Sequence, residues 1–429
     1  KTLFMNTKLL SIGACFLFFF TAKAQSDSLL LNLDFRTRAE MDNGQKTLIP
    51  KGKQAETSVY SRARLGIDYH REHLELYAAL QDARVWGETG STNQRSGSFN
   101  VYEAWAQYQF NEKVGVKIGR QILSYDDERL FGALDWQMQG RSFDAAKGIF
   151  ILNPYSKLET VITYNNDDKD GDDLAENEFY NVLDSGERTK SLQLIHYQYK
   201  KDKTTFSTIG LNSITQHLNG NHYDMVTLGA NAKHYWEHFG VFGSVYYQVG
   251  KNSLAQSKSA YQFSLNADVL LGQHNIVLGT EWLSGTDFDE DTSKNHSFSP
   301  FYGTNHKFNG FMDYFFVGNH FNSVGLKDFY IKSNFKFNPK ATLSANLHAF
   351  SSNAAIGYNA NNDKLSQYLG TELDLVFQYK VASYFTLQVG HSHLFAAEGM
   401  QYLKNIHQSK DLQTWSWIGL NFNTLTRLK

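Results

Sequence analysis

The chain has little cysteine, little proline and almost no net charge. Its 429 residues include one cysteine and four prolines, and the formal net charge is -2. The cysteine, Cys15, lies in an apolar N-terminal segment, so the rest of the chain has no disulfide framework. A charge this close to zero gives no bulk attraction to nucleic acid. The sequence therefore excludes a disulfide-rich domain and argues against a nucleic-acid partner.

Linkers and long apolar runs are also missing beyond the N-terminus. No Ser/Pro-rich stretch and no run of like charges divides the chain, and no later apolar run reaches the roughly 20 residues of a membrane-spanning helix. The N-terminus has Lys8, an apolar stretch and the small-residue motif Ala22-Lys23-Ala24, which together are typical of a signal peptide. We therefore predict a signal peptide over residues 1–24 and one domain over residues 25–429.

Aromatic residues are abundant, and apolar residues alternate with polar ones. Phe, Tyr and Trp make up 15% of the chain, although its average residue is polar. Within 29–41, for example, Leu33 and Phe35 alternate with Asp34 and Arg36. About 18 such segments are joined by connections that alternate between short and long. This pattern predicts an all-β fold, a transmembrane antiparallel β-barrel with short periplasmic turns and long extracellular loops. A soluble sandwich or propeller is the alternative, but neither needs this alternation.

The alternation also predicts which side chains meet lipid, because a side chain among acyl chains must be apolar. Within the predicted strand 324–337, Phe329 and Ile331 should point outward and Asp328 inward. Within the predicted strand 366–379, we expect Leu369, Leu373 and Leu375 outward and Glu372 and Asp374 inward. The last predicted strand is 412–422, and residues 423–429 are expected to lie beyond it.

One connection, residues 125–142, is too long for a hairpin turn, which closes with two to five residues. Arg129, Arg141 and Asp135 lie within it, and Arg120 and Asp144 lie in the strands on either side. Charges this dense avoid a dry interior unless they are paired. We interpret the segment as a constriction loop folded into a water-filled pore, and a solvated surface loop is the alternative.

The same region carries a family resemblance. The motifs are Gly119-Arg120-Gln121, Arg129-Leu130-Phe131-Gly132, Asp135-Trp136, Gly140-Arg141-Ser142-Phe143-Asp144 and a second block over 303–315. They resemble the signature of the alginate export family of outer-membrane β-barrels. Asp126 departs from the pattern, since it stands where the family has glycine. The resemblance implies a pore for an anionic polysaccharide in the outer membrane of a Gram-negative bacterium.

Four arginines on the first two predicted strands share one face and could form a basic ladder on the barrel wall. Guanidinium groups bind carboxylates through two parallel hydrogen bonds, so such a ladder could carry a chain of uronic acids. Alternatively, these arginines only neutralise nearby carboxylates. The candidate pore residues are Arg36, Arg38, Arg62, Arg64, Arg120, Arg129, Arg141, Asp135 and Asp144.

Two further loops have distinctive compositions. Asp168, Asp170 and Asp172 form an oxygen-rich cluster that is a candidate calcium site, although it lacks the full pattern of a calcium-binding loop, and a solvated acidic loop is the alternative. The long loop 284–323 is rich in phenylalanine and should pack on the barrel mouth, fold inside, or contact a partner in the envelope. No other cofactor is indicated.

The sequence has no nucleophile motif, phosphate loop or helical His-x-x-x-His pair, so we expect no enzyme. Three functions stay open. The first is a pore for an anionic polysaccharide or oligosaccharide. The second is a general diffusion or uptake porin. The third is a plugged barrel that serves as a structural component of a larger envelope assembly.

Overall fold

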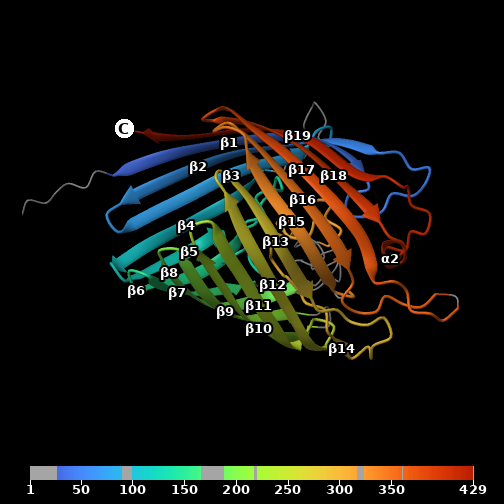
Figure 1. Cartoon of the computed structure of the whole chain (residues 1–429). Coiled ribbons are helices and arrows are strands. Elements are labelled where there is room, and N and C mark those ends of the chain that lie inside the picture. The colour runs from blue at the N-terminus through green and yellow to red at the C-terminus, as the bar shows by residue number, and fades with distance from the viewer. Residues whose placement is uncertain are drawn as a thin grey trace, which may run out of the picture.

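The computed structural model describes residues 27–88, 99–165, 188–216, 220–315, 323–359 and 361–428. The described chain forms a closed antiparallel barrel (Figure 1). Nineteen strands make up the sheet, and one of them, β14, has only two residues, which leaves 18 strands in the wall. The predicted all-β barrel of about 18 strands is confirmed. The predicted signal peptide and the candidate calcium ligands Asp168, Asp170 and Asp172 lie outside the described residues.

Each strand of the wall pairs with its neighbours in sequence, and the pairing of β19 with β1 closes the ring. The strands are β1 (Ser28–Asn43), β2 (Glu56–Arg71), β3 (Leu74–Val85), β4 (Phe99–Asn111), β5 (Val114–Gln121), β6 (Phe143–Asn153), β7 (Ser156–Tyr164), β8 (Arg188–Lys201), β9 (Thr204–Gln216), β10 (His222–Tyr235), β11 (Phe239–Lys251), β12 (Ser257–Leu271), β13 (His274–Leu283), β14 (Lys294–Asn295), β15 (Leu326–Lys336), β16 (Ala341–Ser351), β17 (Tyr368–Ala382), β18 (Phe385–Ala396) and β19 (Gln413–Leu428).

The pleat of these strands separates apolar from polar side chains. In β1, Leu33 and Phe35 are 54% and 43% exposed on the outer wall, whereas Asp34 between them is only 9% exposed. In β15, Phe329 and Ile331 are exposed and Asp328 is fully buried. The outer wall is therefore apolar and the inner wall polar, as a barrel in lipid requires.

A β-bulge near the start of β17 changes one predicted orientation. The pairing of β16 with β17 shifts between Phe350 and Ser351, and Gly370 has a φ of 141°. The extra residue turns Leu369 inward, where it is fully buried, while Tyr368 is exposed. The prediction that Leu369 faces lipid is wrong, because dyad alternation stops at the bulge.

The final strand is longer than predicted. β19 continues past Phe422 to Leu428, and its last residues pair with the start of β1, where Leu428 lies opposite Leu29. The expectation that residues 423–429 lie beyond the sheet is therefore wrong for 423–428. Closing the ring supplies backbone partners that alternation within one segment does not reveal.

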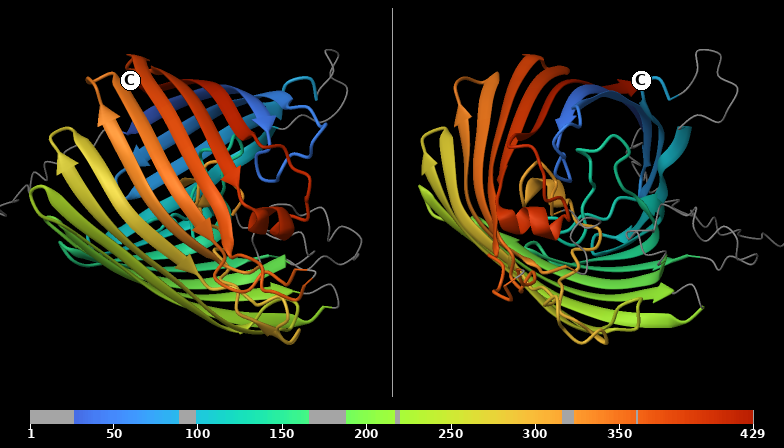
Figure 2. Two further views of the ribbon diagram at one scale, coloured as in Figure 1. Left: turned by 45° about the vertical axis from the view of Figure 1, so that its right-hand side comes forward. Right: turned by 90° about the vertical axis from the view of Figure 1, so that its right-hand side faces the viewer.

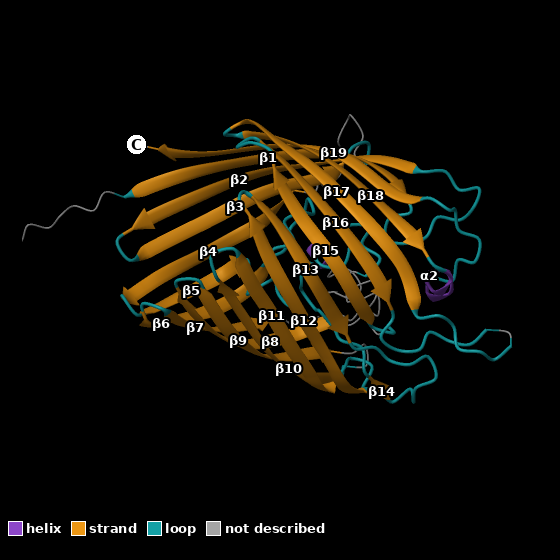
Figure 3. Cartoon of the chain, in the orientation of Figure 1, coloured by secondary structure: helices purple, strands orange, loops and turns teal. Residues whose placement is uncertain are grey.

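Short turns gather at one end of the barrel and long connections at the other (Figure 3). The long connections contain the short helix α2 (Glu398–Leu403) and the 3-10 turn η2 (Asn305–Lys307). Among the described residues, no helix has the length and apolar character to cross a membrane.

Two of the long connections fold into the barrel, as the view from the loop end shows (Figure 2). The first joins β5 to β6 and the second joins β13 to β15. Their apolar side chains form a core with residues of the inner wall and of neighbouring loops. The core residues contributed by these two connections include Leu130, Phe131, Phe298, Tyr302, Met312 and Tyr314. The inserted loops are therefore packed against the inner wall at the loop end of the barrel.

Candidate pore and its charged constriction

The predicted constriction loop, 125–142, crosses the lumen. Near one end of the loop, Asp126 accepts a hydrogen bond from Asn231 of β10 (3.1 Å) and lies 2.8 Å from the Nε2 atom of His196 of β8. Farther along the loop, Asp135 contacts the wall formed by β1 and β2. Asp126 has a φ of 54°, a left-handed conformation that favours glycine. Its two side-chain contacts offset that strain, so the aspartate is tolerated here.

Three arginines of the inner wall converge on Asp135. Their nitrogen atoms lie 2.6 Å (Arg36), 2.8 Å (Arg62) and 3.4 Å (Arg64) from its carboxylate oxygens. Arg36 and Arg62 are register partners on β1 and β2, as a ladder requires. Asp34 also contacts Arg36 and Arg62. We refer to Arg36, Arg62 and Arg64 as the arginine triad.

The electrostatics of the triad favour a bound anion. Burial raises the pKa of Asp135, but the charges of Arg62 and Arg36 and their hydrogen bonds outweigh burial, so the pKa lies below its ordinary value. Asp135 is nevertheless the most accessible member of the group, with 42% of its side chain exposed, whereas Arg62 is fully buried. The triad is therefore fixed in the wall, and its carboxylate partner comes from a loop.

The fourth arginine of the predicted ladder lies in an aromatic cage. The guanidinium of Arg38 lies 5.3 Å from the ring centre of Trp136 in the constriction loop, and 5.9 and 5.8 Å from those of Trp415 and Trp417 in β19. It also donates to Glu40 (2.6 Å) and to the carbonyl of Trp136 (3.0 Å). Arg38 thus fixes the loop through a cation–π contact with Trp136 as well as through a hydrogen bond to its carbonyl.

An acidic part of the inner wall, on β13 and β15, also holds the loops. Arg129 is 1% exposed and forms an ion pair with Glu281 of β13. Asn309, from the second loop, donates to Glu281 (2.8 Å) and to Asp328 of β15 (3.1 Å), and it accepts from Arg129 (3.1 Å). These four buried side chains, Arg129, Glu281, Asn309 and Asp328, join both loops to the wall out of contact with solvent.

Farther round the barrel, carboxylates of β17 bind the backbone of the second loop. The amide of Met312 donates to Glu372 (2.8 Å), and the amide of Phe311 donates to Asp374 (3.3 Å). Both carboxylates are fully buried and point inward, as the alternation predicts. The second loop is therefore clamped to the acidic wall, while the first spans from there to the triad.

The two loops also bind each other. Backbone hydrogen bonds link Gly132 to Tyr302, Tyr302 to Leu130, and Thr304 to Glu128, at 2.9–3.0 Å. Arg141 donates to the carbonyl of Tyr302, so it serves as a brace between the loops. Burial lowers the pKa of Arg141 to about 10.

Arg120 and Asp144 do not line the pore. Arg120 lies on the same side of β5 as Ile118, which is 56% exposed on the outer wall. Asp144 is its register partner on β6, and the two side chains form an ion pair of 3.1 Å. The prediction is wrong for these two residues, because both lie within paired strands whose pleat turns them outward.

Docking of the constriction loop should depend on pH through Asp127. Burial raises the pKa of this carboxyl to about 6, despite the nearby charge of Arg129. A raised acid pKa stabilises the folded state below the ordinary pKa near 4, and that stabilisation is lost as pH rises through 6. We expect the unfolding free energy to fall by about 1–2 kcal/mol from pH 4 to pH 7.

Thermal unfolding of the detergent-solubilised protein across this range measures the effect. Asp127→Asn should remove the slope between pH 4 and 6. The lowered pKa of Asp135 acts with the opposite sign and at lower pH, since its ionised form is the favoured one. An unchanged slope in the Asp127→Asn variant would assign the titration to another group.

Several residues of the constriction were not singled out from the sequence. Asn309 has no charge to mark it, and His306 stacks on Trp136 with ring centres 3.6 Å apart. Both come from the block 303–315 that carries the family resemblance. The family resemblance is the only sequence signal that marks this block, because an asparagine in a long loop is common and indicates no particular function.

The comparisons with known proteins agree with this architecture. The alginate export family matches residues 27–405. The fold is similar to that of OccAB4 of Acinetobacter baumannii, with 12% identity, a TM-score of 0.62, and coverage of 94% of this chain and 99% of that one. It is also similar to the outer membrane protein OpdK of Pseudomonas aeruginosa, with 10% identity, a TM-score of 0.62, and coverage of 93% and 99%. No curated protein matches the chain.

These findings place the barrel in lipid, in the outer membrane of a Gram-negative bacterium. The predicted location is confirmed, and so is the prediction that the protein is a channel and no enzyme. By its matched sequence and its barrel of 18 strands, the chain belongs to the alginate export family of outer-membrane channels.

Proposed function

We propose that this channel passes an anionic polysaccharide or oligosaccharide, and that uronate carboxylates bind the arginine triad on the way. The observation that carries the proposal is the convergence of Arg36, Arg62 and Arg64 on the single carboxylate of Asp135. Guanidinium groups held in this way match the planar geometry of a carboxylate. A neutral solute would lack this charge-assisted pairing.

Asp135 then acts as an internal substitute for the substrate. Its carboxylate occupies the place on the triad that a uronate would take, and it belongs to a loop instead of the wall. An incoming polyanion competes with Asp135 for the same guanidinium groups, and displacement frees the constriction loop at that wall. Because one carboxylate replaces another on the triad, the net gain in binding free energy is small. The polyanion therefore binds weakly enough to be released, as conduction requires.

Single-channel recording with uronate oligomers tests the proposal. The wild-type channel should show block that depends on oligomer concentration. Arg36→Met combined with Arg64→Met should raise the half-blocking concentration at least tenfold, because hydrogen bonds to charged groups contribute about 1.5–3 kcal/mol each. Arg120→Met is the matched control, since its ion pair lies on the outer wall, and it should block like the wild type.

A neutral oligosaccharide of the same length should leave the current unchanged. Equal block by neutral and charged oligomers would overturn the proposal and favour a general diffusion porin. One fold relative has been solved with vanillate, a small carboxylate, so monomeric carboxylates belong in the same series. Block by vanillate but not by oligomers would favour uptake of small anions.

A second candidate rests on the packing of the lumen. Leu130, Phe131, Tyr302 and Met312, from the two inserted loops, are at most 2% exposed, which also suits a plugged barrel that serves as a structural component with envelope protein partners. Such a barrel should show no conductance even at high oligomer concentration, and it should retain a partner through purification.

A further inference from the structure

A second polar group lies on the inner wall at the other end of the barrel, near the short turns. Asp68 and His70 alternate along the last turn-side residues of β2, and Glu75 lies directly opposite His70 on β3. Their outward neighbours Ile67 and Leu76 are each 40% exposed, which sets the three polar side chains inward. The group lies in the part of the lumen that the two inserted loops leave open.

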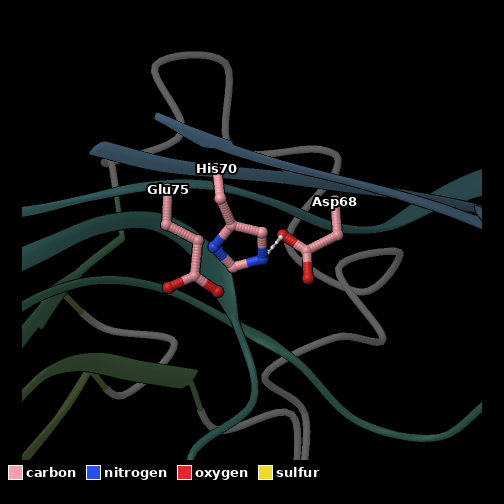
Figure 4. A group of neighbouring side chains, drawn as sticks. All are labelled: Asp68, His70 and Glu75. Carbon is pink, nitrogen blue, oxygen red and sulfur yellow. Dashed lines mark ion pairs between the residues drawn. The ribbon is translucent and has the colours of Figure 1, made fainter. Parts of the chain in front are cut away.

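The three side chains approach one another closely. Figure 4 shows the imidazole of His70 between the two carboxylates. One ligand atom from each residue lies within 4.8 Å of the others. The Nε2 atom of His70 lies 3.0 Å from Oδ1 of Asp68. Adjacent ligands of a tetrahedral ion with bonds of about 2.0–2.2 Å lie roughly 3.3–3.6 Å apart, so small side-chain rotations would bring these atoms to that separation.

Among the described residues, these three side chains have few polar partners besides one another, which leaves their ligand atoms available to a cation. Oδ1 of Asp68 is buried and receives no hydrogen bond of good geometry from any described group, although Nε2 is so near. Glu75 receives a long contact of 3.5 Å from Gln107 and lies within electrostatic range of Lys117, so a small rotation of its carboxylate toward His70 breaks no short hydrogen bond among the described residues. A cation between the three would satisfy the buried oxygen and leave one coordination position open to the lumen.

We propose that Asp68, His70 and Glu75 bind a divalent first-row transition ion, of which Zn²⁺ is the representative. One imidazole nitrogen and two carboxylate oxygens suit zinc, whereas calcium prefers oxygen ligands alone. The carboxylates also repel a passing polyanion, and a bound dication offsets both charges. This role in passage rests on the proposed function, but the binding itself does not.

Calorimetric titration of the detergent-solubilised full chain with ZnCl₂ tests the binding. We expect one saturable site per chain. His70→Gln and Glu75→Gln should each weaken the affinity at least tenfold, and heat-modifiable migration on gels checks that both variants still fold. His73→Gln is the matched control, because His73 is exposed in the adjacent turn, and it should bind like the wild type.

No saturable binding, or an equal loss in the His73→Gln variant, would overturn the site. Uronate block with and without Zn²⁺ then tests its role. Zinc should lower the half-blocking concentration in the wild type and leave it unchanged in His70→Gln. If zinc binds but changes uronate block equally in both proteins, the metal site stands and its role in passage is overturned. If uronate oligomers block neither protein, with or without Zn²⁺, the result counts against the proposed function and leaves the metal site standing.

Discussion

Replacing Arg129 by methionine should release the inserted loops from the acidic wall. The change leaves the carboxylate of Glu281 buried and without its cation, and breaking a buried ion pair costs about 3–5 kcal/mol. This free-energy cost weakens the docking of the constriction loop on the wall, because Arg129 belongs to the loop and Glu281 to the wall. Hydrogen exchange followed by mass spectrometry should show the amides of Gly132, Tyr302 and Thr304 exchanging about 100-fold faster or more.

Two variants check that burial causes the effect. Arg129→Met combined with Glu281→Gln should recover most of the protection, since no buried charge then lacks a partner. Arg120→Met removes the same type of pair from the outer wall, where Asp144 is 58% exposed, and should change protection by less than about 1 kcal/mol. Similar losses in Arg129→Met and Arg120→Met would show that desolvation does not govern docking.

Replacing Asp135 by asparagine should make the channel bind uronate oligomers more tightly. The triad then keeps only the carboxylate of Asp34, which contacts Arg36 and Arg62, and an incoming carboxylate no longer has to displace that of Asp135. Since hydrogen bonds to charged groups contribute about 1.5–3 kcal/mol each, the half-blocking concentration should fall about 10- to 100-fold. Single-channel recording at fixed ionic strength measures the change, and raising the salt concentration should reduce it.

Asp144→Asn is the matched control, because it removes an equal charge from the outer wall. Its half-blocking concentration should equal that of the wild type. If Asp144→Asn tightens block as much as Asp135→Asn does, overall charge explains the result and the internal-substitute mechanism fails. Unchanged block in Asp135→Asn would instead mean that the triad is not on the path.

The location of individual charges was only partly predictable. Arg62 and Arg64 follow the alternation of β2, so their inward direction could be read from Leu65 and Ile67. Arg120 follows a similar alternation, but its place beside the charged loop predicts a role in the pore, whereas the structure turns it outward. Leu369 fails for a related reason, because the bulge at Gly370 inserts one residue and reverses the faces beyond it.

The sequence alone determined the barrel, the number of its wall strands and the presence of a charged loop of unusual length. These follow from local periodicity, since each strand must turn apolar side chains to lipid wherever its partners lie. Only the tertiary structure decided what the charges do. Arg129 is 152 residues from Glu281, and Asp135 is 99 residues from Arg36. Closing the ring and inserting the loops brings such groups together, and no pattern within a segment specifies those distances.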